Sequence, residues 1–172
     1  MTRPQWEQRV EELWAAFDDH EPADFLARAE ALVAELPPGD AAALFELASA
    51  HDATDREEEA AALYRQALAA GLPDGRRRRA VIQLASTLRN LGRPEESIDL
   101  LTAERDAASD GLDDTVTAFL ALALADAGRE REAAALALTA LAPHLPLYTR
   151  SLTHYARALT DDRSAHRSAD GP

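Results

Sequence analysis

Histidines are the residues in this chain best suited to metal binding or proton transfer. No two of the five are three or four residues apart: His20, His51, His144, His154 and His166. A helical zinc site needs two imidazoles on one face, and that spacing would supply them. Residues 18–21, Asp-Asp-His-Glu, form the only cluster of acids with a histidine, and a helix end before Pro22 explains their charge equally well. We therefore predict no metal site.

The motifs of common enzyme classes are also missing. The chain has no lysine, so it has no phosphate-binding Gly-x-x-x-x-Gly-Lys loop, and it has no Gly-x-Gly-x-x-Gly or Gly-x-Ser-x-Gly motif. The absence of cysteine excludes thiol nucleophiles and disulfides, and fits a reducing compartment. His51 is the best remaining candidate for a base, but a packed helix position explains it better. We predict that the protein is not an enzyme and uses no cofactor.

The charge of the chain is strongly acidic and unevenly spread. The net charge is −13; residues 1–74 contain 17 acidic residues and 5 arginines, and residues 75–172 contain 14 and 13. Because acidic chains are repelled by phosphates, we predict no nucleic-acid or membrane partner. The apolar stretch 117–127 is shorter than the roughly 20 residues that span a bilayer, and the first residues contain no apolar signal segment. We expect a cytoplasmic protein.

The sequence predicts helices along nearly the whole chain. Strong helix formers dominate, and apolar residues recur three or four positions apart. Asp40 and Asp55 are predicted N-caps, and Gly92 and Gly128 are predicted helix ends. Residues 161–172 lack an apolar face, so we predict a disordered tail there. The predicted helices cover about 4–18, 22–36, 40–53, 56–70, 76–91, 94–108, 112–127, 130–142 and 146–160.

An internal repeat groups these helices into hairpins. The turn residues Asp55, Gly92 and Gly128 are 37 and 36 residues apart. A leucine and an alanine precede each turn, and a small residue follows it by five positions. The first copy is the clearest: Leu47, Ala48, Ala60, Tyr64 and Ala67. Small residues let antiparallel helices approach, and a large apolar residue fills the groove between them. The other copies depart from the pattern at Glu104, where alanine is expected, and at Ala137, where a large residue is expected.

This pattern resembles the tetratricopeptide repeat. Residues 44–50 and 76–92 are also similar to a small bacterial family of stand-alone tetratricopeptide proteins, and the likeness covers about residues 22–142. It implies an all-α, right-handed superhelical stack of antiparallel helical hairpins. We predict a single domain over residues 1–160. Its parts are a degenerate hairpin at about 4–38, repeats at about 40–74, 76–110 and 112–146, and a capping helix at about 146–160.

The resemblance also implies where a ligand would bind, because the first helix of each hairpin lines a concave groove. The residues in that register are Phe45, Glu46, Arg79, Gln83, Thr87, Asn90 and Phe119. Such a mixture suits an extended peptide or a partner helix. Core packing is the alternative role for Phe45 and Phe119. We predict a protein–protein interaction module; the alternative is a regulatory sensor or a small-molecule binder that uses the same groove.

Two further features leave alternatives open. The arginine run at residues 76–79 could pair with the acidic runs at 52–59 and 110–114, bind an anion of a partner, or contact nucleic acid. Trp6 and Trp14 share a helix face, and could cover the N-terminal end of the stack or form the patch of a homodimer.

Overall fold

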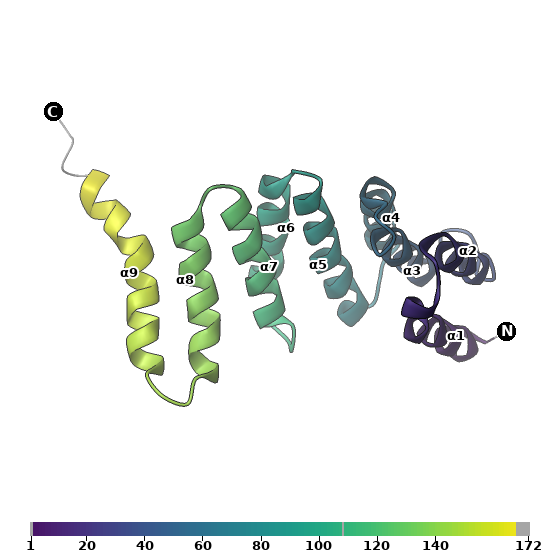
Figure 1. Cartoon of the computed structure of the whole chain (residues 1–172), viewed down its shortest axis with the longest axis horizontal. Coiled ribbons are helices and arrows are strands. Elements are labelled where there is room, and N and C mark those ends of the chain that lie inside the picture. The colour runs from purple at the N-terminus through teal and green to yellow at the C-terminus, as the bar shows by residue number, and fades with distance from the viewer. Residues whose placement is uncertain (1, 108, 168–172) are drawn as a thin grey trace. The chain divides into compact units, whose positions relative to one another are not determined.

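The computed structural model describes residues 2–107 and 109–167 (Figure 1). Every regular element in those residues is a helix, which confirms the all-α prediction. None of these helices is long and apolar enough to cross a membrane. The elements are α1 (Arg3–Ala15), η1 (Phe17–Asp19), α2 (Pro22–Val33), α3 (Ala41–Asp52), α4 (Glu57–Ala69), α5 (Asp74–Asn90), α6 (Pro94–Ala107), α7 (Asp113–Asp126), α8 (Glu130–Leu141), η2 (Ala142–His144) and α9 (Thr149–Arg167).

The last helix is longer than the sequence predicts. The predicted capping helix ends at residue 160, whereas α9 continues to Arg167. The segment from residue 161 contains Asp, Arg, Ser, Ala and His, none of which breaks a helix, so the helix continues through it. The predicted tail of residues 161–172 therefore begins inside α9, and its residues 168–172 lie outside the described part of the chain.

The chain divides into two compact units, residues 1–91 and 92–172. In the first unit α1 packs against α2, α2 against α3, α3 against α4 and α4 against α5. In the second unit α6 packs against α7, α7 against α8 and α8 against α9. Packing between sequence neighbours is the organisation of a helical repeat. The boundary between the units falls inside the predicted repeat of residues 76–110, and the single domain over residues 1–160 stays a prediction.

The repeat positions form the core. Ala48, Ala60, Tyr64 and Ala67 of the first copy are each 0% exposed. The corresponding Leu101 is also fully buried, and Glu104 is 4% exposed at a position where the repeat favours alanine. Ala137, at the corresponding position of the third copy, is exposed.

The three turn positions share one backbone conformation. Gly92 and Gly128 have φ values of 73° and 72°, and Asp55 has a φ of 58°. The prediction that Asp55 is an N-cap is therefore wrong: Arg56 is the N-cap of α4, and Asp55 occupies the left-handed position before it. Aspartate tolerates this conformation better than most residues, which explains how it replaces the glycine of the other copies.

Replacing Asp55 with glycine should stabilise the protein. A left-handed conformation costs an L-residue about 1 kcal/mol, and glycine avoids that cost. We expect Asp55→Gly to raise the free energy of unfolding by about 1 kcal/mol and Asp55→Val to lower it, because a β-branched residue is strained at positive φ. Urea denaturation of the three proteins measures the difference. A less stable Asp55→Gly protein would contradict the assigned turn.

Candidate functional site

The first unit contains a pocket of about 420 Å³. It is formed by α1, α3 and α5, which the sequence predicts to be the first helices of successive hairpins. Helix α1 supplies one wall, α3 the floor and α5 the other wall. The lining residues are Trp6, Glu7, Val10, Glu11 and Trp14 from α1, Phe45, Glu46 and Ser49 from α3, and Arg76, Arg79 and Gln83 from α5.

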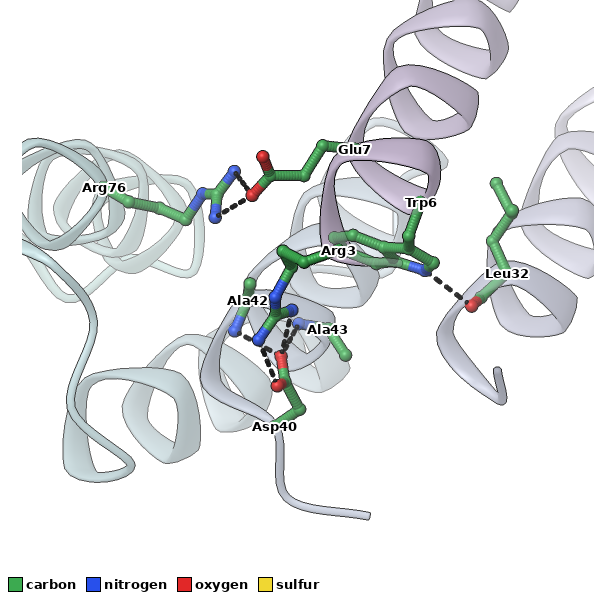
Figure 2. Close-up of polar contacts among 8 residues, drawn as sticks. All are labelled: Arg3, Trp6, Glu7, Leu32, Asp40, Ala42, Ala43 and Arg76. Carbon is green, nitrogen blue, oxygen red and sulfur yellow. Dashed lines mark hydrogen bonds and ion pairs between the residues drawn. The ribbon is translucent and has the colours of Figure 1, made fainter. Parts of the chain in front are cut away.

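Helix α1 is fixed in place by contacts near its start (Figure 2). The Trp6 side chain is 0% exposed, and its indole Nε1–H donates to the Leu32 carbonyl oxygen at 2.8 Å. Both terminal nitrogens of the Arg3 guanidinium donate to the Asp40 carboxylate. Asp40 also caps α3, accepting from the backbone N–H groups of Ala42 and Ala43 at 3.0 Å each, so the predicted N-cap is confirmed.

Asp40 therefore joins two stabilising roles that can be separated. We expect Asp40→Ala to lower the free energy of unfolding by about 1–2 kcal/mol, mostly through the lost cap. Asp40→Asn should retain the cap and lose only the pairing with Arg3, a smaller loss because the Arg3 side chain is 45% exposed. Urea denaturation at pH 7 measures both. Equal losses in the two variants would contradict the capping role.

The ion pair between Arg3 and Asp40 predicts that the free energy of unfolding depends on pH. The hydrogen bond from Arg3 holds the pKa of Asp40 below its usual value. The stabilisation is therefore complete above the unfolded pKa of about 3.9, and is lost as the pH falls below it. Asp40→Asn should lack this contribution, so the stability gap between wild type and Asp40→Asn should narrow between pH 7 and pH 3. A constant gap would contradict the assignment.

The floor of the pocket combines an aromatic ring with a carboxylate. The Phe45 side chain is 1% exposed, and the Arg79 guanidinium carbon lies 5.5 Å from its ring centroid. Glu46 accepts a hydrogen bond from the Trp14 indole Nε1–H at 3.0 Å. Burial raises the pKa of the Glu46 carboxyl, and the bond from Trp14 opposes that rise. The pocket thus places a partly desolvated acid beside a cation held over an aromatic face.

The arginine run separates into different environments. Arg76 donates to a single oxygen of Glu7, at 3.3 and 3.4 Å, and so connects α5 with α1 (Figure 2). Arg78 is 2% exposed, whereas Arg79 is exposed at the pocket. Of the alternatives open for this run, intramolecular pairing occurs for Arg76, but its acid is Glu7 and not a member of the acidic runs. Four successive helix positions point in four directions, which explains the division.

The predicted site residues divide into two groups. Phe45, Glu46, Arg79 and Gln83 line the pocket. Thr87 is fully buried; its hydroxyl donates to Asp52 Oδ1 at 3.0 Å and approaches the Gln83 carbonyl oxygen at 2.8 Å, so it supports α5 and offers no surface contact. Asn90 is exposed at the end of α5, outside the pocket lining, and Phe119 is a half-buried residue of the second unit.

Sequence reasoning did not include α1 in the site. The wall on the α1 side consists of five residues of that helix: Trp6, Glu7, Val10, Glu11 and Trp14. The signal was the shared helix face of Trp6 and Trp14, which favoured either an end cap or a dimer patch. Trp6 is fully buried, and the Trp14 ring packs 4.9 Å from that of Phe25 and 5.9 Å from that of Phe17. Trp6 is therefore part of the end cap and no exposed patch.

The comparisons with known proteins agree with this architecture. A family model described as the tetratrico peptide repeat matches residues 41–159. The match begins at the first residue of α3 and ends within α9, so it includes two of the three helices that form the pocket. Neither a curated protein nor a solved structure matches the chain. Because the model covers more than half of the 172 residues, the chain belongs to the tetratrico peptide repeat family.

Proposed function

We propose that the protein is an interaction module that binds a segment of a partner protein in the pocket of α1, α3 and α5. Tetratrico peptide repeats generally mediate protein–protein interactions. The observation that carries the proposal is that α1, α3 and α5 form one pocket, and that four residues predicted from the repeat register line it. The additional wall from α1 gives the pocket a closed N-terminal side.

The chemistry of the pocket suits an extended peptide. Arg79 and Gln83 offer N–H donors to backbone carbonyl groups, and Glu46 offers an acceptor for a backbone N–H. Glu46 uses one carboxylate oxygen for Trp14, and the other has no hydrogen-bond partner among the described residues. Trp14, which lines the pocket and is half-buried, supplies apolar surface for a side chain of the peptide. A peptide backbone presents hydrogen-bond donors and acceptors in alternation. It therefore matches a pocket whose lining side chains include both donors and acceptors.

The test is capture of partners from an extract of the native cells with tagged protein. We expect Arg79→Ala to weaken retention of a specific partner about tenfold, since a hydrogen bond from a charged donor is lost. The matched control is Arg28→Ala, which removes an exposed arginine from α2 in the same unit, outside this pocket. Equal retention by wild type and both variants would overturn the pocket assignment.

Self-association can be measured on the same samples. Light scattering of wild-type protein gives the molar mass in solution and tests the expected homodimer directly. A dimer that persists in Arg79→Ala would use a different surface from the pocket. A dimer lost in Arg79→Ala and kept in Arg28→Ala would identify a second copy as the occupant.

A further inference from the structure

The second unit contains a separate pocket of about 380 Å³. Its volume lies within the range of about 300–1,000 Å³ typical of sites for small organic ligands. Side chains from α6, α7, α8 and α9 line it, so it is built entirely within residues 92–172. Its apolar lining comes from five aliphatic side chains: Ile98, Leu120, Leu124, Ala135 and Leu136.

Three arginines and one glutamate supply the charges of this pocket: Arg105, Arg129, Arg157 and Glu132. Their formal sum is +2, although the whole chain carries −13. Arg129 forms a salt bridge with Glu132, donating from Nε at 3.1 Å and from Nη2 at 2.7 Å. The local excess of positive charge therefore comes from Arg105 and Arg157.

Arg157 is the cation best placed to receive a ligand. It lies on α9, is exposed, and makes no ion pair within the part of the chain that the structure describes. Arg105 forms an ion pair with its exposed neighbour Asp106 at 3.3 Å, and a pair so exposed contributes little. An unpaired guanidinium beside an aliphatic lining is a donor group that can bind a carboxylate through two parallel hydrogen bonds.

We propose that this pocket binds a small amphiphilic carboxylate, with its aliphatic chain against the half-buried Leu136 and its head group at Arg157 and Arg105. Transfer of the chain from water onto the aliphatic lining supplies most of the affinity. The guanidinium groups fix the orientation and select an anion. The site is independent of the peptide pocket, which belongs to the other unit, so either can fail without the other.

The test is calorimetric titration of the full-length protein with octanoate. Acetate and 1-octanol are the matched probes, because the first lacks the aliphatic chain and the second lacks the charge. We expect saturable octanoate binding with a dissociation constant below about 1 mM, and much weaker binding of both probes. Absence of saturable octanoate binding, or equal binding of 1-octanol, would overturn the proposal.

Three variants locate the site. Arg157→Gln should weaken octanoate binding about tenfold through loss of a charged hydrogen-bond donor. The control Arg150→Gln removes another exposed arginine of α9 that does not line the pocket, and should bind as wild type does. Thr139→Trp places a large ring at the pocket lining and should abolish binding while leaving the circular dichroism spectrum unchanged. Equal effects of Arg157→Gln and Arg150→Gln, or unchanged binding in Thr139→Trp, would contradict the location.

Discussion

Replacing Trp6 with alanine should lower the free energy of unfolding of the first unit by about 3–5 kcal/mol, the usual cost of removing a fully buried aromatic side chain. Trp6 is 0% exposed and packs in a cluster with Val10, Leu32, Ala42 and Ala43. These residues come from α1, α2 and α3, so the loss separates the N-terminal wall of the peptide pocket from its floor. Urea denaturation followed by the fluorescence of Trp14, on the same helix, measures it.

Trp6→Phe is the matched variant. It keeps an aromatic ring in the cluster and removes the indole N–H that donates to Leu32 at 2.8 Å. The Leu32 carbonyl oxygen then loses a partner, at a cost of about 1–3 kcal/mol. Hydrogen exchange should show faster exchange of the α1 amides in Trp6→Ala than in Trp6→Phe. A loss below about 1 kcal/mol in Trp6→Ala would contradict the packing of α1 described above.

Replacing Tyr64 with alanine should have an effect of similar size. Tyr64 is 0% exposed on α4, and its ring centroid lies 6.1 Å from that of Phe45 on α3. It is the large residue that fills the groove of the first hairpin, so Tyr64→Ala should cost about 3–5 kcal/mol. The substitution also removes support from beneath Phe45, and we expect weaker partner binding as a second consequence.

Tyr64→Phe separates packing from hydrogen bonding. The hydroxyl donates to Ser49 Oγ at 3.3 Å, and Ser49 itself donates to the Phe45 carbonyl oxygen at 3.0 Å. Loss of the hydroxyl alone should cost about 1 kcal/mol. Urea denaturation of wild type, Tyr64→Ala and Tyr64→Phe measures the contributions of packing and of the hydrogen bond to the free energy of unfolding. A Tyr64→Phe protein as unstable as Tyr64→Ala would show that the polar network, and not the filled groove, holds this hairpin together.

Local spacing was enough to predict the repeat. Ala48, Ala60, Tyr64 and Ala67 are all fully buried, as their positions around the turn predict. The reason is that a hairpin of two helices fixes which residues face each other, whatever the rest of the chain does. The resemblance to the tetratricopeptide repeat placed Phe45 and Arg79 on adjoining first helices. Four of the seven predicted site residues consequently line one pocket.

Contacts between distant segments could not be predicted in this way. Glu7 and Arg76 are 69 residues apart, and their pairing depends on how α1 lies across α3. The tryptophans of α1 could be recognised as apolar, but their spacing does not specify the helix against which they pack. The conformation of Asp55 was missed because aspartate is favoured both as an N-cap and at a left-handed turn. Alignment with Gly92 and Gly128 was the signal that could have decided between them.

The most direct test of the account is site-specific photo-crosslinking in the native cells. A photoreactive amino acid replaces either Gln83, which lines the pocket on α5, or Gln66, an exposed glutamine on α4 outside it. The account predicts a crosslink to one partner from position 83, lost when Arg79→Ala is added, and none from position 66. Crosslinks of equal yield from both positions, or from position 66 alone, would contradict binding in the pocket.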